Sequence, residues 1–369
     1  MNKNFSIILL LLAFTGAFKA DAFRLVDATA GTPLPLASVT DRSGNVVGLT
    51  DKTGEIPALG ADRFPVTFNY MGYEPLEVPG PVDADVKMNP RDYDLPEIVI
   101  TTDSRPLLRL TGYMRELTSV LNETDSVTIF RESMVDFLVP VKKTKVKGWD
   151  KARQLASRTY VRMTDSDGLD SVSAEHEYEF ILWGDKQSLI PDATEIPEAI
   201  RGKDFACDTI MGKFGPKAIW WKNGDKVRWY GDALANNKDH KASPLLLKLL
   251  GFTADFTELS KSIIFDAPDG DLIKPTDLRQ LSLTIDMLGR GKWFKKGFES
   301  KSPVNVRSYM ELYLTDREFL TEEEGRELKK EPAALETSDI VAPAEAAPLH
   351  PAIRVMVGRV RDGVGDPRK

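Results

Sequence analysis

The sequence predicts an N-terminal all-β sandwich followed by a larger α+β domain with antiparallel strands. Three observations indicate this fold class. Residues 23–90 form short apolar runs separated by turn signals every eight to twelve residues or so, a spacing typical of β-sandwiches. Residues 105–330 combine strand-like alternation with runs of helical spacing. The 369 residues, 42% of them hydrophobic and 28% charged, suffice for two or three domains of roughly 150 residues.

The first 22 residues have the three parts of a secretory signal peptide. Lys3 gives a positive start, residues 5–14 form an apolar run, and the sequence ADA at 20–22 has the small side chains that a signal peptidase accepts. The apolar run of about 10 residues would be roughly 15 Å long as a helix, half of what a bilayer core requires. The sequence therefore predicts an exported protein whose residues 1–22 are removed.

The composition argues against several functional classes. A formal net charge of −7, from 49 Lys and Arg against 56 Asp and Glu, disfavours a dedicated nucleic-acid binder. Cys207 is the single cysteine, so an intramolecular disulfide and a CxxC pair are excluded; we expect it to be a small buried residue. Three histidines leave little material for a histidine-based metal centre. No metal or other cofactor is predicted.

The predicted sandwich is built from short strands and polar turns. Gly in the turns at 43–45 and 51–54 adopts positive φ at little cost, and Asp51 can bond to its own backbone. The expected strands are 23–26, 37–40, 46–50 and 65–70, with a further strand beginning at 72–74.

Three motifs in this region resemble a known family. They are GTPLPLASV at 31–39, GLTDKTG at 48–54 and VTFNYMGY at 66–73. In this order they are similar to the opening, the turn and the strand pair of the carboxypeptidase regulatory-like domain, although residues 55–57 replace the usual Phe strand. The resemblance implies a transthyretin-like β-sandwich over residues 23–90, about one fifth of the chain, that works by contacts and not by bond chemistry.

The connecting segment, residues 91–104, adds to the resemblance. Its LPEIVITT at 95–102 is similar to the segment that follows this module in outer-membrane TonB-dependent importers and in smaller envelope proteins of the same bacteria. About 267 residues remain, without the serial alternating strands of a large barrel. The resemblance implies a barrel-less protein in the periplasm or associated with the outer membrane.

The larger domain, residues 105–330, is expected to mix helices and strands. Residues 105–121 have apolar positions at helical spacing, and Thr321 with Glu324 forms a capping box. Asn223-Gly224 favours a tight hairpin over residues 217–230. Further strands are expected in 126–141 and at 158–163, 178–183, 262–265, 281–287 and 304–314, with a short helix at 244–250. Residues 331–369 are predicted to be an Ala/Pro-rich linker and a basic tail, with a last strand at 353–357.

One motif raises the question of a metallopeptidase. His176 and Glu179 match H-x-x-E, which supplies two zinc ligands in metallocarboxypeptidases. Such a site needs a distant third ligand, and the alternation around His176 places the two side chains on opposite strand faces. The preferred interpretation is a solvent-facing strand, so no catalytic residue is predicted.

Two Asp-rich runs offer clustered carboxylates, at 165–170 and 266–271. Neither fits the EF-hand frame, which requires Gly at position six and Glu at position twelve. Asp-Gly turns are favoured over calcium sites.

The candidate ligand contacts are aromatic and basic. Four aromatic residues lie in one hairpin, and because neighbouring strand residues face opposite ways, Trp220 and Trp221 cannot both be buried on one face. A core role is favoured over a sugar-stacking platform. A second group consists of basic side chains around an aromatic run that includes Trp293. These side chains could contact anionic headgroups or glycans, although solvated loops are the preferred interpretation. The candidates are Trp220, Trp221, Trp229, Tyr230, Trp293, Lys295 and Lys296.

These observations predict an exported, non-catalytic envelope protein that acts as a binding or scaffolding module. An envelope protein or a glycan is the expected partner, peripheral membrane contact is possible, and nucleic acid is not expected. The alternative is an accessory protein for a hydrophobic ligand or a glycan, with an aromatic-lined pocket. A metallocarboxypeptidase-like enzyme is the less favoured alternative. Oligomeric state is left open.

Overall fold

A computed structural model describes residues 23–91, 105–149, 151–174, 189–241, 252–268, 270–291, 302–332 and 335–363. The described chain is mostly β, and its largest unit is an antiparallel sheet. The predicted signal peptide and most of the connecting segment lie outside these residues. No helix among the described residues is long and apolar enough to cross a membrane.

The N-terminal module, residues 23–91, contains two small sheets. Four antiparallel strands have the order β3-β2-β4-β5, and β1 pairs with β6 in parallel. Leu25, Val39 and Phe68 lie at the centre of its own apolar core. The strands are β1 (Leu25–Asp27), β2 (Ser38–Asp41), β3 (Val46–Leu49), β4 (Val66–Asn69), β5 (Leu76–Val78) and β6 (Val86–Met88). Most lie close to the predicted ranges, whereas the strand expected from residue 72 begins at Leu76 because 70–73 form a turn.

Most of the remaining described strands form one ten-stranded antiparallel sheet with the order β10-β9-β8-β7-β18-β17-β15-β14-β13-β12. Its strands are β7 (Leu107–Leu121), β8 (Ser126–Pro140), β9 (Arg153–Thr164), β10 (Asp170–Ser173), β12 (Phe205–Met211), β13 (Pro216–Asn223), β14 (Lys226–Asp232), β15 (Phe252–Asp266), β17 (Leu278–Gly291) and β18 (Val304–Leu320). Two short strands, β11 (Thr194–Glu195) and β16 (Leu272–Ile273), form a separate pair. The antiparallel strands agree with the sequence prediction, but helices contribute less to the described part of this domain than an α+β fold implies.

The helix predicted over residues 105–121 is wrong, because this segment is strand β7. It pairs along its length with β8 on one side and β18 on the other. Leu110 faces the main apolar core, while Leu107 and Tyr113 are buried on the opposite face. Burial on both faces removes the alternation of apolar and polar residues that marks a half-buried strand.

The sheet has an apolar face and a mixed face, here called the polar face, on which smaller apolar clusters alternate with buried polar pairs. The apolar face carries the main core, including Leu110, Phe137 and Leu281. On the other face, Tyr113 Oη donates to Glu132 Oε1 at 2.7 Å, and Arg115 forms an ion pair with Glu311. This polar face supports the N-terminal module and the C-terminal segment.

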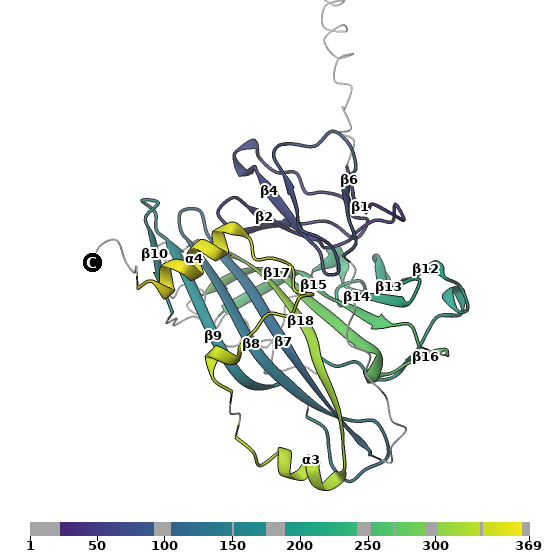
Figure 1. Cartoon of the computed structure of the whole chain (residues 1–369). Helices are drawn as coiled ribbons and strands as arrows, with labels where there is room; N and C mark the ends of the chain where they lie inside the picture. The colour runs from purple at the N-terminus through teal and green to yellow at the C-terminus, as the bar shows by residue number, and fades with distance from the viewer. Residues whose placement is uncertain are drawn as a thin grey trace, which may run out of the picture.

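The C-terminal segment crosses the polar face (Figure 1) and ends in helix α4 (Pro351–Arg361), which packs on β9 and β10. The strand predicted at 353–357 is therefore wrong. Pro351 occupies the first helical turn, and His350 Nδ1 accepts from the Ala352 N–H. Ile353, Met356 and Val357 have the spacing of one helix face and are buried together.

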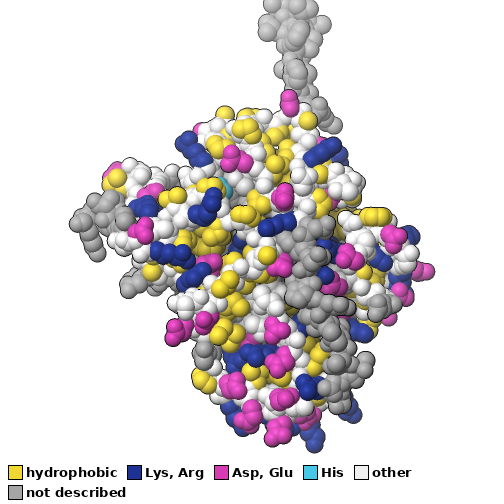
Figure 2. All heavy atoms as spheres, in the orientation of Figure 1, with side chains coloured by type: hydrophobic (Ala, Val, Ile, Leu, Met, Phe, Trp, Pro, Cys, Tyr) yellow, Lys and Arg dark blue, Asp and Glu magenta, His cyan; other side chains and the backbone are white. Residues whose placement is uncertain are grey.

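Helix α3 (Glu322–Leu328) confirms the predicted capping box. Thr321 Oγ1 accepts from the Glu324 N–H at 3.2 Å, and Glu324 Oε2 accepts from the Thr321 N–H at 2.7 Å. Figure 2 shows acidic side chains gathered at the end of the molecule where α3 lies. Of these, Glu322, Glu323 and Glu324 lie in the first turn of α3 and complement the positive end of the helix dipole.

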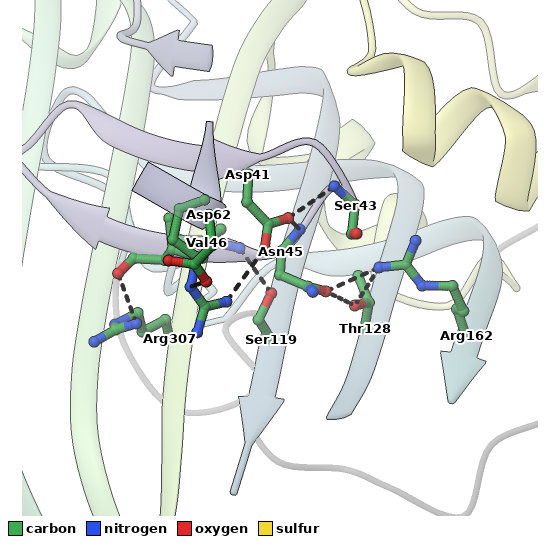
Figure 3. Close-up of polar contacts among 11 residues, drawn as sticks. Asp41, Ser43, Asn45, Val46, Asp62, Ser119, Thr128, Arg162 and Arg307 are labelled. Carbon is green, nitrogen blue, oxygen red and sulfur yellow. Dashed lines mark hydrogen bonds and ion pairs between the residues drawn. The ribbon is translucent and has the colours of Figure 1, made fainter. Parts of the chain in front are cut away.

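The hairpin of β2 and β3 docks on the polar face of the sheet (Figure 3). Asn45 Oδ1 accepts from Thr128 Oγ1 at 2.6 Å and from Arg162 Nη2 at 2.9 Å. The Val46 N–H donates to Ser119 Oγ at 3.1 Å. These buried hydrogen bonds fix the module against the sheet, and so determine the space between them.

Candidate functional site

A cavity of about 490 Å³ lies between the N-terminal module and the large sheet. Its walls come from the turn after β4, the loop after β1 and the polar face of β12, β13, β14 and β17, and Glu345 of the C-terminal segment lies at one side. Segments far apart in the sequence therefore form one site. The aromatic residues that line it are Tyr70, Tyr73, Phe205 and Trp221.

Strand alternation separates the predicted aromatic candidates. The predicted hairpin is confirmed, with β13 and β14 joined at Asn223-Gly224 and Gly224 at φ 58°. Trp220 lies in the main core and meets Trp229 edge-to-face, with ring centroids 6.4 Å apart. Trp221 faces the other way and lines the cavity.

Tyr230 is a core residue, as the preferred interpretation of the hairpin aromatics predicts. It is 1% exposed and packs with Leu36 of the module and with Ile219. Burial raises the pKa of its hydroxyl well above the usual value, helped by the nearby carboxylate of Glu258. Of the four hairpin aromatics, Trp221 is the one that lines the cavity.

Arg228 of the sheet contacts the N-terminal module and also lines the cavity. Its Nη2 donates to the Met71 carbonyl oxygen at 2.8 Å, and its guanidinium lies 4.7 Å from the ring centre of Tyr70 and 5.3 Å from that of Tyr73. Nη1 is buried without a hydrogen-bond partner among the described residues. Stacking on two aromatic faces fixes the guanidinium in place.

Gly72 permits this close approach. Its φ is 81°, and a Cβ at this position would lie 2.9 Å from Arg228 Nη2 and 3.1 Å from Ile264 Cδ1. The left-handed conformation and the short contacts both require glycine.

Further polar groups line the cavity. Tyr73 Oη donates to Asp27 Oδ2 at 2.6 Å, while Asp27 Oδ1 accepts the N–H groups of Thr29 and Ala30. Both carboxylate oxygens of Asp27 therefore accept hydrogen bonds from within the module. Gln280 is 6% exposed, and its Oε1 is buried with no partner in the described parts of the chain.

The edge strand β12 supplies one part of the cavity lining. In the described sheet β12 pairs with β13 alone, and Phe205 at its start is 71% exposed. The prediction that Cys207 is buried is wrong, because it lies exposed on this edge strand and lines the cavity.

A charged cluster on the same sheet face binds the N-terminal module to the sheet. Asp232, with its side chain fully buried, forms an ion pair with Lys52 of the module, and its Oδ2 lies 2.7 Å from His240 Nε2. Glu258 is also buried nearby; desolvation raises its pKa to about 7, and the negative charge of Asp232 adds to the shift.

Several residues singled out in the sequence lie in parts of the chain that the structure does not describe. Trp293, Lys295 and Lys296 lie outside the described residues, as do His176 and Glu179. In the described ranges, no group of three or more His, Cys, Asp or Glu side chains is placed to hold a metal ion. The turn at 165–170 is confirmed, with Asp165 Oδ1 accepting from the Asp167 and Leu169 N–H groups.

A scan against protein-family models found no matching family, and a search of curated proteins found no matching sequence.

Proposed function

We propose that this chain is an exported, non-catalytic binding protein of the bacterial envelope that holds a small ligand between its N-terminal module and its large sheet. The cavity of about 490 Å³ between the two carries this proposal. Small-molecule sites commonly occupy roughly 300–1,000 Å³ and combine apolar walls with a few placed polar groups. Trp221, Tyr73 and Arg228 supply that combination here.

A carboxypeptidase regulatory-like, transthyretin-like module at residues 23–90 is part of the proposal. The motifs at 31–39, 48–54 and 66–73 support it, as do two small sheets around a separate apolar core. In this proposal the module contributes one wall of the binding site and contacts the ligand through its turn at 70–73.

The ligand class favoured by the lining is a glycan. A lipid-binding cavity would be lined almost wholly by apolar groups, whereas this one also contains Arg228, Gln280 and Asn223. Aromatic rings and hydrogen-bonding side chains together suit a molecule with apolar ring faces and polar edges.

Intrinsic tryptophan fluorescence tests the proposed binding site. Titrating the mature protein with envelope glycan fractions should give a saturable change, and fatty acids should give none. Trp221→Leu should abolish it, whereas Lys217→Ala, an exposed position of the same strand outside the cavity lining, should leave it unchanged. Saturable binding that persists in Trp221→Leu would remove the cavity as the site.

Export is tested separately. Cell fractionation followed by N-terminal sequencing should recover a chain that begins at Phe23 in the envelope fraction. Recovery of the uncleaved chain with cytoplasmic markers would contradict the proposed location.

A further inference from the structure

Arg228 lacks an anionic partner among the described residues. It contacts the Met71 carbonyl and the side chains of Tyr70 and Tyr73, including a hydrogen bond with Tyr70, and all of these groups are neutral. Its Nη1 has no hydrogen-bond acceptor in the part of the chain that the structure describes. A buried guanidinium that has lost water and gained no counter-charge is costly. Since Arg228 lines the cavity, a ligand carboxylate or phosphate would supply both the missing charge and the missing acceptor.

Gln280 adds a second requirement. Its buried Oε1 accepts hydrogen bonds and has no donor in the described chain. Carboxylates and fully ionised phosphates accept but do not donate, so a simple anion would satisfy Arg228 and leave Gln280 unpaired. The complementary ligand therefore carries a hydroxyl group as well as an acid group.

Trp221 adds a third requirement. It lies opposite Arg228 in the pairing of β13 with β14, and the two side chains share the cavity-facing side of the sheet. Its indole presents a flat apolar surface next to the guanidinium. A ligand with a ring can pack on this surface while its acid group reaches Arg228.

We infer that the cavity binds an acidic sugar, a uronic-acid residue of a glycan, with its carboxylate at the Arg228 guanidinium, a hydroxyl group at the Gln280 amide and its ring on Trp221. Arg228 Nη1 and Gln280 Oε1 are buried in the described structure, so the ligand binds as both side chains turn toward the cavity that they line. This inference rests on the proposed binding function and names the ligand class of the same site. Sugar rings carry a carboxylate, hydroxyl donors and a C–H face on one small frame, which meets all three requirements.

Calorimetric titration with matched pairs of oligosaccharides tests the inference. The probes are short oligomers of polygalacturonate, alginate and hyaluronan, each compared with the same oligomer after its carboxyl groups are reduced to alcohols. At least one acidic oligomer should bind at least tenfold more tightly than its reduced form. Inorganic phosphate and acetate should not compete at the same concentration, because neither supplies the ring or both polar groups.

Three variants assign the preference to residues. Arg228→Met should abolish the preference for the acidic form, and Arg228→Lys should keep part of it, because a charge remains without the second nitrogen. Gln280→Leu should weaken both forms about equally. Arg290→Met is the control, since Arg290 is half-exposed, pairs with Asp255 and lies away from the cavity; it should retain the full preference.

The outcomes separate the inference from the proposed function. Equal binding of acidic and reduced oligomers, lost in Trp221→Leu, would overturn the acidic-sugar assignment and leave the binding site in place. Competition by inorganic phosphate would replace it with a phosphate-bearing ligand. An absence of binding by every glycan would overturn both.

Discussion

His240 Nε2 lies 2.7 Å from Asp232 Oδ2, and Lys52 of the N-terminal module binds the same carboxylate oxygen. The side chain of Asp232 is fully buried, whereas Lys52 and His240 are each about one-fifth exposed. One carboxylate of the sheet is therefore the anchor for a cation from the module and for a histidine that also contacts the Thr257 carbonyl.

Lys52→Met should weaken the docking of the module. Removing one partner of a buried pair leaves the other under-compensated, although His240 still contacts Asp232. We expect the free energy of unfolding to fall by about 1–3 kcal/mol in denaturant titration. Lys330→Met, which removes a pair of two exposed side chains, should change it by less than about 0.5 kcal/mol. Equal losses in the two variants would show that the anchor adds no stability.

Glu258 should make stability depend on pH. Its raised pKa of about 7 means that the folded protein holds a proton between pH 4.5 and 7, where the unfolded chain has lost it. The free energy of unfolding should therefore fall as pH rises through this range, by at most about 3 kcal/mol, and this contribution should be constant above pH 7.

Glu258→Gln keeps the side chain neutral at every pH. The variant should show a flatter pH profile and should be more stable than the parent protein at pH 8, because repulsion from Asp232 and Asp286 is removed. Thermal unfolding between pH 4.5 and 8 provides the measurement. Parallel profiles for the two proteins would mean that Glu258 is not the titrating group.

The two neighbouring tryptophans should respond differently to truncation. Trp220 is 5% exposed within the main core, so Trp220→Ala should cost about 3–5 kcal/mol. Trp221 faces the cavity and already has an open side, so Trp221→Ala should cost less than about 2 kcal/mol. Chemical denaturation of both variants measures the difference. A larger loss for Trp221→Ala would contradict the assignment of faces.

The features that the sequence predicted correctly are those set by neighbouring residues. Asn223-Gly224 determines its own tight turn, and Thr321 with Glu324 caps a helix within one turn of chain. The alternation of Trp220 and Trp221 also follows from local geometry.

Features that depend on distant contacts were missed. Residues 107–121 are a strand because they pair with β8 and β18, which places Tyr113 opposite Tyr313. Likewise, Arg228 and Gln280 line one cavity with the turn at 70–73 because the module lies against β14 and β17. The motif at 66–73 includes both tyrosines that line the cavity. Its sequence could not indicate that Arg228, from a strand over 150 residues away, contacts this turn.

Asn45 should be the most sensitive position in the docking hairpin. It is 8% exposed, and its Oδ1 accepts from both Thr128 and Arg162. Burial lowers the pKa of Arg162, which shows how poorly this guanidinium is solvated. Asn45→Ala removes the shared acceptor, so the Thr128 hydroxyl loses its acceptor and Arg162 Nη2 keeps only its longer hydrogen bond to Thr128 Oγ1 at 3.3 Å. We therefore expect a loss of about 1–3 kcal/mol in the free energy of unfolding.

Asn45→Asp provides the matched comparison. It keeps an acceptor oxygen for both donors and adds a negative charge facing Arg162, so it should lose less than half as much stability as Asn45→Ala. The added charge also approaches Asp41, whose Oδ1 accepts from the Asn45 N–H, which is why full recovery is not expected. Thermal and denaturant unfolding of the two variants and the parent protein measure the order. If aspartate proves as damaging as alanine, the stability lies in the packing of Asn45 and not in its acceptor, and the polar contacts of Figure 3 do not hold the module in place.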